Sequence, residues 1–400
     1  MANKKRLLFI HDALPSQGIS GQIVFLRHFE RLKDWDIEIV VPDQVVSNST
    51  TPFSSNWKIH TLPSRQTFWP PFREENPILL KSRIWLWQKY LEKNILAKNK
   101  PDAILTVLWH YYAVTAANLA KKWDIPLFVI IHDCWDLRST SSSQTQIRKQ
   151  YATKVLANAK KVWSVTRQLG EYFTGKNFSN LEVLPPIPAG YNGTKVGWKS
   201  SFTEAAVIIY AGTVEAYHYR AFAAIATAMK ESNDTLIIIT NPGNETVNQL
   251  TNTFNNIKFI PSFPENQQAI EFIINHASAV LVSYGFAIAE NPFAEYSFPS
   301  KFVEFCHTGL PILAVAPPES AFCSWLEEND WSLLIQAEDI DAIKSMLQLL
   351  KQQKQWEEMT SQTSAVSQTY FNPERIHQIF ESGLNSVIYR DNPTPNPPPR

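Results

Sequence analysis

The chain has 400 residues, 44% of them hydrophobic and 18% charged, and its 37 Lys and Arg equal its 37 Asp and Glu in number. This composition is typical of a folded soluble protein, and the length predicts two or three domains of roughly 100–200 residues each. Because the charges balance, the chain has no overall basic field to attract phosphate backbones, which argues against a nucleic acid as the main partner.

Cysteine content and hydrophobic runs bear on the compartment. The chain has three cysteines, Cys134, Cys306 and Cys323, and no CxxC pair. An odd, sparse set is neither a disulfide framework nor a zinc site, so we expect a reducing compartment. The apolar run at residues 7–10 is too short for a signal peptide, and no stretch approaches the roughly 20 apolar residues that span a bilayer. We therefore expect a cytoplasmic protein and leave peripheral contact with a membrane open.

In the first half of the chain, short apolar runs alternate with helical patterns. The expected strands are residues 7–10, 37–41, 103–108, 127–131 and 162–165. The expected helices are residues 19–32, 78–97, 111–122 and 144–159. The strand-like runs are continuously apolar, as in strands buried on both faces, and the alternation of strand and helix predicts a parallel, doubly wound sheet.

The pattern breaks at residues 184–197, which are rich in proline and glycine and are typical of a linker. A second series of expected strands follows at residues 207–210, 236–239, 257–260, 279–282 and 312–315. Its expected helices are residues 219–229, 266–275, 300–308 and 340–351. We therefore predict two α/β domains, residues 1–188 and 189–370. A C-terminal helix at 371–390 and a proline-rich, disordered tail at 391–400 complete the chain.

The first candidate segment is the loop between the first expected strand and the first expected helix. It contains Gly18, Ser20 and Gly21. Glycine lets the backbone approach a ligand closely, and the helix N-terminus offers N–H groups to an anion. The GxGxxG fingerprint of dinucleotide-binding domains is absent, which argues against an NAD site. A plain strand-to-helix turn remains the alternative.

The second candidate segment, His132 and Asp133, directly follows the expected strand at residues 127–131. Open α/β sheets bind ligands at the carboxyl ends of their strands. His132 could donate a hydrogen bond to a phosphate or a sugar hydroxyl, and Asp133 could orient it or bind a hydroxyl itself. The alternative is a capped loop held by a packed Trp135.

The third candidate segment follows the first expected strand of the second domain. Gly212 would let a diphosphate approach the backbone, and Thr213 could donate a hydrogen bond to it. His218 and Arg220 stand near the start of the next expected helix, either as partners of the phosphates or as solvated helix residues.

Residues 296–315 are the most informative segment. Pro299 suits the first turn of a helix, so Ser300 and Lys301 then lie at a helix N-terminus that favours an anion such as a diphosphate. Glu304 stands three residues after Lys301, so both side chains can face the same way, and its carboxylate can accept hydrogen bonds from a ribose diol. The alternative is an ordinary amphipathic helix with a Lys–Glu surface pair.

This segment resembles the donor-binding signature of glycosyltransferase family 4 and its GT-B-fold relatives, which reads approximately P-[ST]-K-x-x-E-[YF]-x-x-x-G-x-P-[VI]. The matching residues are Pro299, Ser300, Lys301, Glu304, Phe305, Gly309, Pro311 and Ile312. The pair His132-Asp133 is similar to an H-D pair of the family, and Tyr210-Ala211-Gly212 is similar to its Y-x-G turn. The loop with Gly18 and Gly21 stands where the family keeps a glycine loop on the acceptor side.

The resemblance implies a GT-B fold, in which two Rossmann-like doubly wound domains face a cleft. It implies that a nucleotide sugar binds mainly to the second domain and an acceptor to the first, and that the last helix returns to the first domain. Family members retain the anomeric configuration. They need neither a metal nor a cofactor, because helix N-termini and basic side chains hold the diphosphate.

The same resemblance assigns roles to the candidate residues. Donor contacts fall to Gly212, Thr213, His218, Arg220, Ser300, Lys301 and Glu304, with Glu304 on the ribose. Catalytic roles fall to His132, Asp133 and Lys301, with His132 on the transferring sugar. Acceptor-side contacts fall to Gly18, Ser20 and Gly21.

Two positions depart from the family pattern. No basic residue stands at the usual first place after Gly212, where Glu215 has the wrong sign, and Tyr296 replaces a frequent glutamate eight residues before Glu304.

We predict a retaining glycosyltransferase of polysaccharide biosynthesis with a glycan, lipid-linked or small-molecule acceptor. The alternative is a catalytically silent GT-B scaffold that binds a partner protein or a glycan. A nucleotide-sugar 2-epimerase, a phosphorylase and a periplasmic-type binding protein are further rivals.

Residues 67–87 are rich in aromatic and basic side chains. They could form a platform for the acceptor or rest on a membrane surface. The alternative is an aromatic helix that packs on its own sheet.

Overall fold

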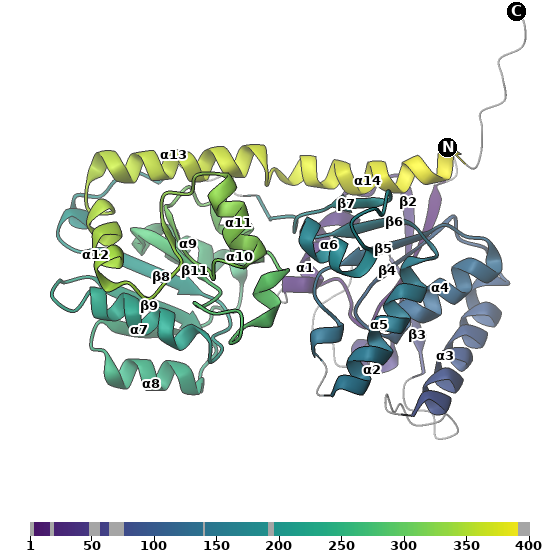
Figure 1. The fold of residues 1–400 in the computed structure, drawn as a ribbon. Coiled ribbons are helices and arrows are strands. Elements are labelled where there is room, and N and C mark those ends of the chain that lie inside the picture. Colours follow the sequence, from purple (N-terminus) through teal and green to yellow (C-terminus); the bar gives the residue numbers. More distant parts are fainter. Residues whose placement is uncertain are drawn as a thin grey trace, which may run out of the picture. The chain divides into compact units, whose positions relative to one another are not determined.

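The chain folds into two compact units that each contain a parallel sheet. The computed structural model describes residues 4–16, 20–47, 57–63, 76–138, 141–190 and 196–390. The N-terminal unit comprises Met1–Pro185 and Glu374–Arg400, and the C-terminal unit comprises Pro186–Pro373. In both units, helices pack against the sheet (Figure 1). The predicted class of two doubly wound α/β domains is therefore confirmed. The proline-rich tail at 391–400 lies outside the described residues.

The N-terminal sheet has seven strands in the order β3-β2-β1-β4-β5-β6-β7. All neighbouring strands are parallel. The strands are β1 (Lys5–Ile10), β2 (Trp35–Pro42), β3 (Lys58–Leu62), β4 (Ala103–Val107), β5 (Leu127–Ile131), β6 (Ala159–Ser164) and β7 (Leu181–Val183). The five predicted strands are confirmed. The two edge strands, β3 and β7, were not predicted because their side chains are largely polar or half-exposed and show no continuous apolar run.

Seven helices belong to the described part of the N-terminal unit. They are α1 (Ser20–Arg31), α2 (Asp43–Ser47), α3 (Pro77–Leu91), α4 (Tyr111–Trp123), α5 (Ser142–Leu156), α6 (Arg167–Thr174) and α14 (Pro373–Arg390). A π-helical turn, Glu92–Leu96, extends α3. Side chains cap several N-termini: Asn76 accepts from two backbone N–H groups of α3, and Thr166 accepts from Leu169 N in α6. Such caps satisfy the N–H groups that have no partner within the helix.

The last helix, α14, docks on the N-terminal unit. Lys5 Nζ on β1 donates to Asn385 Oδ1 at 2.9 Å. Gly383 packs directly against the ring of Trp163 on β6, since a Cβ placed there would lie 2.5 Å from the ring carbon Cζ2. The side chains of Phe380 and Leu384 are buried beneath the helix. These contacts make α14 part of the core of this unit although it is distant in sequence.

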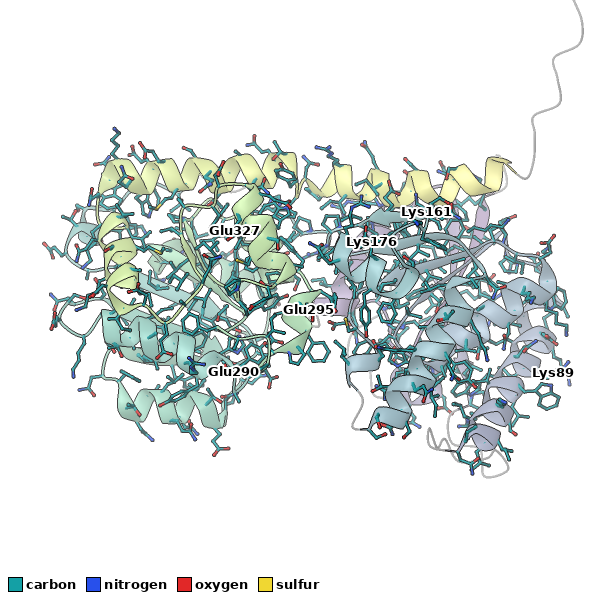
Figure 2. The ribbon with its side chains drawn as sticks, viewed as in Figure 1. Lys89, Lys161, Lys176, Glu290, Glu295 and Glu327 are labelled. Atoms are coloured by element: carbon teal, nitrogen blue, oxygen red, sulfur yellow. The ribbon has the colours of Figure 1, made fainter. Side chains whose placement is uncertain are left out.

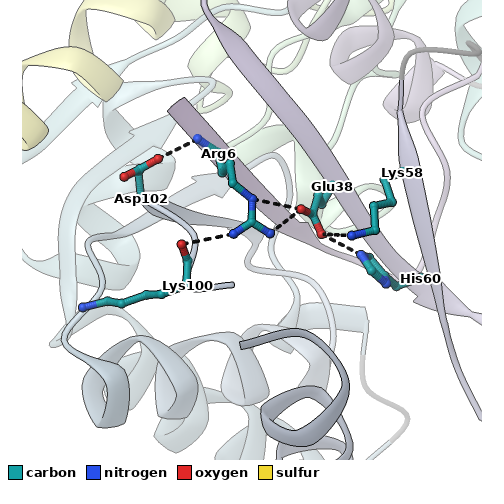
Figure 3. A network of polar contacts seen from close by, with 6 residues as sticks. All are labelled: Arg6, Glu38, Lys58, His60, Lys100 and Asp102. Carbon is teal, nitrogen blue, oxygen red and sulfur yellow. Dashed lines mark hydrogen bonds and ion pairs between the residues drawn. The ribbon is translucent and has the colours of Figure 1, made fainter. Parts of the chain in front are cut away.

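A buried carboxylate links the first three strands of this sheet (Figure 3). Glu38 on β2 is 7% exposed and accepts from His60 Nε2 on β3 at 2.7 Å and from Arg6 Nε on β1 at 3.1 Å. Lys58 Nζ on β3 lies 3.5 Å from Glu38 Oε2. The hydrogen bond from His60, followed by those from Arg6, lowers the pKa of Glu38 to about 2, against the opposing effect of burial. The network therefore holds the polar edge strand β3 in the sheet.

The C-terminal sheet has six parallel strands in the order β10-β9-β8-β11-β12-β13. They are β8 (Val207–Ala211), β9 (Thr235–Thr240), β10 (Ile257–Pro261), β11 (Ala279–Ser283), β12 (Ile312–Val315) and β13 (Leu334–Ile335). The helices are α7 (His218–Ala228), α8 (Glu245–Thr253), α9 (Asn266–His276), α10 (Ser300–Cys306), α11 (Ala321–Glu328), α12 (Ile340–Leu349) and α13 (Gln353–Thr369). The predicted strands and helices are confirmed. Strand β13 and helices α8, α11 and α13 were not predicted, because the strand has two residues and α8 and α13 have few apolar positions.

No helix within the described ranges combines the length and the apolar character that crossing a membrane requires. Nor do the described residues bring three or more His, Cys, Asp or Glu side chains together in a group that could hold a metal ion.

Candidate functional site

Each sheet contains one point at which the order of its strands reverses. In the N-terminal unit this point lies between β1 and β4, and in the C-terminal unit it lies between β8 and β11. At such a switch point the loops that follow the two strands diverge, and open α/β sheets bind ligands there. Of the predicted site residues, Gly212 and Thr213 directly follow the central strand β8. Ser300, Lys301 and Glu304 lie on α10, between β11 and β12 in the chain.

In the C-terminal unit, α10 presents two of the predicted residues on one side. Phe302, Val303, Phe305 and Cys306 are buried, whereas Lys301 and Glu304 are only half-buried. The helix begins at Ser300, and Pro299 precedes it as the N-cap with an extended backbone rather than as the first helical residue. The three-residue spacing from Lys301 to Glu304 thus places both side chains on the face that the core leaves uncovered, as predicted.

Lys301 extends over the turn that follows β8. A Cβ placed on Gly212 would lie 3.7 Å from Lys301 Cε and 3.4 Å from the hydroxyl of Tyr210. The Lys301 ammonium lies 5.8 Å from the ring centre of Phe305 on its own helix. Two segments that were predicted separately, and that are far apart in sequence, therefore meet at the switch point. We call Gly212, Thr213, Ser300, Lys301 and Glu304 the Lys301 site.

The turn after β8 offers an anion fewer donors than the sequence suggests. The N–H of Gly212 donates to Ile239 O at 3.0 Å and is therefore engaged in the sheet. The carbonyl of Thr213 accepts from the Tyr210 hydroxyl at 2.6 Å, while Thr213 itself is exposed. Gly212 thus contributes space beside Lys301, and its amide is already used.

His218 occupies a different position from the one predicted. It is 2% exposed, its Nδ1 accepts from Glu215 N at 3.0 Å, and its Nε2 lies 3.2 Å from Ser283 O. Because Nδ1 accepts, the proton stands on Nε2 and points to the Ser283 carbonyl. Burial lowers the pKa of His218 to about 4, so the ring is neutral at pH 7. His218 therefore connects the turn after β8 to the end of β11, and it is neither a charged partner of phosphate nor a solvated residue.

Arg220 is exposed and bound by two carboxylates. Its Nη1 lies 2.9 Å from Glu290 Oε1, and its Nη2 lies 2.9 Å from Glu338 Oε2. Glu290 lies on the surface of the C-terminal unit (Figure 2). Because the guanidinium already has two anionic partners, a phosphate would compete with them for its charge.

The carboxylate of Glu304 has two partners within its own unit. Its Oε2 accepts from Ala189 N at 3.3 Å, and its Oε1 accepts from Asn266 Nδ2 at 3.2 Å. Asn266 is the first residue of α9. A carboxylate has about four acceptor positions, so its two oxygens can accept more hydrogen bonds than one each.

In the N-terminal unit, His132 and Asp133 follow β5 as predicted, and both are half-buried. The His132 ring stacks on Phe25 of α1, with the ring centres 5.1 Å apart and the planes at 20°. Burial, and to a lesser extent the charge of His11, lowers the pKa of His132 to about 4. At neutral pH the imidazole is therefore uncharged and can donate or accept one hydrogen bond per nitrogen.

The predicted glycine loop lies only partly within the described residues. Gly18 lies outside them, and only the backbone of Ser20 is described, at the start of α1. Gly21 is exposed, and a Cβ placed on it would meet no atom within 4 Å. The surrounding protein therefore does not require glycine at position 21.

A polar group that was not predicted lies at the start of the same loop. His11 Nδ1 lies 3.0 Å from Asp12 Oδ1, and His110 Nε2 lies 3.9 Å from Asp12 Oδ2. His11 and Asp12 directly follow β1, and His110 precedes α4 after the neighbouring strand β4. The rule that selected His132, a polar residue directly after a buried strand, would also have selected Asp12. We call His11, Asp12 and His110 the Asp12 cluster.

The aromatic segment that begins at residue 67 divides in the structure. Residues 64–75 lie outside the described residues. Within α3, Trp87 is buried and stacks on Tyr112 of α4 at 4.5 Å, which agrees with a helix packed on its own unit. On the opposite side of α3, Ile78 is 76% exposed and Trp85 is 55% exposed.

Comparison with known proteins bears on this geometry. Residues 35–186 match the family model of the glycosyl transferase 4-like domain. This part of the chain is thus similar to that family's domain. This domain extends from β2 to the end of the first segment of the N-terminal unit, so the segment around Lys301 lies outside the match. No curated protein matches the sequence.

Three solved structures share the architecture over nearly the whole chain. Anabaena HepE, in complex with UDP and glucose, has a TM-score of 0.65 at 12% identity and covers 96% of this chain and 100% of its own. The lipopolysaccharide outer core galactosyltransferase WaaB has a TM-score of 0.65 at 13% identity, with coverage of 96% and 99%. A trehalose-phosphate synthase from Burkholderia vietnamiensis has a TM-score of 0.61 at 11% identity, with coverage of 96% and 100%. At these identities the likeness shows the fold alone, which is the GT-B fold that the resemblance predicts.

Proposed function

We propose that this protein is a glycosyltransferase that uses a nucleotide-diphosphate sugar as donor and binds it at the Lys301 site. The contact between Lys301 and the Gly212 turn carries the proposal, because it places a cation beside a backbone turn at the switch point of the C-terminal sheet. The glycosyl transferase 4-like domain supports the reaction class. The crystal structures of HepE with UDP and with UDP-glucose support a uridine nucleotide as the first donor to test.

The main chemical requirement of the site is to stabilise the negative charge on the leaving phosphate. The bond between the anomeric carbon and the diphosphate oxygen breaks, and its electron pair leaves with the phosphate. The acceptor hydroxyl forms the new bond to the anomeric carbon, and its proton passes to the departing phosphate oxygen. Lys301 stabilises the negative charge that develops there. Stabilisation of developing charge by preorganised groups is usually the largest single contribution to catalysis.

We further propose that transfer retains the anomeric configuration and needs no metal, since the diphosphate meets Lys301 and the first turn of α10. Glu304 binds the ribose, and His132 and Asp133 contact sugar hydroxyls. The neutral ring of His132 suits this role, because a neutral imidazole can both donate and accept hydrogen bonds. A glycan, a lipid-linked sugar or a small molecule would serve as acceptor in polysaccharide biosynthesis.

A thermal-shift series tests donor binding directly. The full chain is heated with UDP, GDP, ADP or TDP, and a diphosphate at about 100 times its Kd is expected to add about 2.7 kcal/mol of stability. Lys301→Ala should reduce the shift, whereas Lys354→Ala, at an 85% exposed side chain on α13, should leave it unchanged. If none of the four nucleotides raises the midpoint, the proposal fails.

One alternative has structural support. His218 is neutral and buried, and Arg220 is held by Glu290 and Glu338, so Lys301 receives little help from these two residues in binding a diphosphate. A catalytically silent scaffold would bind a partner protein or a glycan without cleaving a donor. Release of nucleotide from a panel of nucleotide sugars distinguishes the two functions, because only the enzyme releases it.

We also propose that α3 makes peripheral contact with an anionic membrane surface. Its outer side carries the exposed Ile78 and Trp85 together with Lys81 and Lys89, at helical spacing. Lys89 lies at the outer edge of the unit (Figure 2). Exposed aromatic and apolar side chains flanked by lysines are typical of helices that rest on lipid headgroups. In liposome flotation, Ile78→Ser with Trp85→Ser should abolish binding to anionic vesicles, and unchanged binding would contradict the proposal.

A further inference from the structure

The Asp12 cluster lies in the N-terminal unit and has no part in the donor chemistry described above. Asp12 leaves β1 at its carboxyl end, and its side chain is 24% exposed. His11, which is 8% exposed, lies beneath it and hydrogen-bonds to Oδ1 through Nδ1 at 3.0 Å. Rings of Phe9 and Phe25 surround His11, with centres 5.5 and 5.7 Å away. The carboxylate is therefore held in a fixed direction by a buried, packed partner.

The second oxygen of Asp12 has a more open environment. His110 Nε2 lies 3.9 Å from Asp12 Oδ2, which is beyond hydrogen-bonding distance, and the His110 side chain is 43% exposed. A single hydroxyl oxygen about 2.8 Å from each atom would bridge them. Such a hydroxyl can donate to the carboxylate and exchange a second hydrogen bond with the imidazole.

The charges near the cluster favour a neutral ligand. Burial raises the pKa of Asp12, but the hydrogen bond and charge of His11 and the charge of His110 outweigh it, so the net effect lowers the pKa and the carboxylate stays ionised at neutral pH. The pKa of Tyr112 is raised by burial and by the charges of Asp12 and Asp43, while Arg83 opposes them. The charge of Asp12 therefore also acts on Tyr112 of α4. An ionised carboxylate repels a phosphate, whereas sugar hydroxyls can donate hydrogen bonds to it.

We propose that Asp12, oriented by His11 and bridged to His110, is a positioning residue that receives a hydroxyl group of a sugar acceptor. This inference rests on the proposed glycosyltransferase function and names its acceptor class as a neutral, polyhydroxylated sugar. The Asp12 carboxylate accepts a hydrogen bond from the sugar hydroxyl and thereby fixes the orientation of the acceptor sugar. Asp12 therefore determines which acceptor is used and has no contact with the nucleotide.

The experiment compares Asp12→Asn with wild type in the full chain. The substitution keeps the size of the side chain but replaces one carboxylate oxygen by an amide donor. Transfer from a nucleotide sugar that the wild type cleaves is measured with p-nitrophenyl hexosides and their monodeoxy analogues as acceptors. We expect the acceptor KM to rise at least tenfold, while the donor KM and the slow hydrolysis of donor without acceptor stay within twofold.

The deoxy analogues separate recognition from a general structural effect. In the wild type, the analogue that lacks the bridging hydroxyl should bind at least tenfold more weakly, and in Asp12→Asn the same deletion should have almost no effect. Asp102→Asn is the matched control, because Asp102 is exposed at the opposite, amino end of the same sheet and accepts only from Arg6 N among the hydrogen bonds described for it.

Each outcome decides a separate point. An unchanged acceptor KM in Asp12→Asn, or equal losses for every deoxy analogue in both proteins, would overturn the role of Asp12. Transfer to none of the hexosides by a wild-type protein that cleaves its donor would overturn the assignment of a sugar acceptor. A wild-type protein that cleaves no nucleotide sugar at all would overturn the proposed function together with this inference.

Discussion

Two residues that were predicted to bind a diphosphate have different environments in this structure. Lys301 and His218 were both expected to meet a diphosphate. Lys301 is half-buried and extends over Gly212, so its charge lies beside the turn at the switch point. His218 is buried, neutral and hydrogen-bonded through both nitrogens to the turns that it connects. A sequence motif specifies the residue type, but the burial of the side chain decides whether its charge can act.

Lys301→Ala should lower kcat on the order of 100-fold, because it removes a positive charge aimed at the oxygen on which negative charge develops. The expected change is in turnover more than in donor KM. Steady-state kinetics with the donor identified by thermal shift measures it, and Lys354→Ala serves as the exposed-lysine control. Turnover equal to that of wild type would contradict the role of Lys301.

Glu304→Ala should mainly raise the donor KM, by roughly tenfold, because a ribose contact is made equally in the ground state and the transition state. Glu304 also accepts from Ala189 N and Asn266 Nδ2, so the thermal midpoint must be measured alongside. Glu271→Ala, an exposed glutamate on α9 that accepts from Gln267, is the control. Calorimetry that finds wild-type donor affinity in Glu304→Ala would exclude the ribose contact.

At the scale of elements, α14 illustrates how a helix distant in sequence joins the core of the N-terminal unit. Its apolar side chains recur at helical spacing, which predicted a helix there. Besides those apolar side chains, the docking surface includes Gly383, which meets the Trp163 ring. It also includes His377, whose Nδ1 lies 3.2 Å from the Nδ1 of His28 on α1. Neither contact can be read from the periodicity, because both depend on which side chains the sheet and α1 present.

Gly383→Ala should destabilise the N-terminal unit by about 1–3 kcal/mol, because the new methyl group would lie 2.5 Å from a ring that the core holds in place. Trp163 cannot easily move, since it is fully buried with Phe128 on one side and Phe380 on the other. Chemical denaturation measures the loss. The matched control, Gly21→Ala in α1, meets no neighbour and should be neutral or slightly stabilising. Equal stability of Gly383→Ala and wild type would contradict this packing.

At the scale of the whole molecule, both units contain buried histidines whose pKa is lower in the folded chain than in the unfolded chain. His132 in the N-terminal unit and His218 in the C-terminal unit have pKa values of about 4. Burial also lowers the pKa values of His28 and His377. Below pH 6.5 the unfolded chain binds protons at these positions that the folded chain does not bind, so acid favours unfolding.

The free energy of unfolding should therefore fall as the pH drops from about 6.5 to about 4, by up to about 3 kcal/mol for each of His132 and His218. Glu38 adds a second loss at lower pH. Its pKa is lowered to about 2, so its contribution is complete above about pH 4.5 and disappears between there and pH 2. Thermal midpoints at pH 7.5, 5.5 and 4.5 measure the first loss. His218→Gln should reduce it and exposed His276→Gln should not, whereas a constant midpoint between pH 7 and pH 5 would contradict it.

The sequence by itself determined the class of fold, because a strand buried on both faces is a continuous apolar run whatever surrounds it. That property located nine central strands and the edge strand β10. The helix start at Pro299 located the segment around Lys301. Edge strands β3 and β7 escaped prediction, since their stability comes from neighbours such as the Glu38 network and not from their own hydrophobicity. The tertiary structure alone decided which polar residues share a site. Charge and hydrogen bonding act over a few ångströms of space, and folding brings Gly212 to Lys301 and His110 to Asp12 across long stretches of chain.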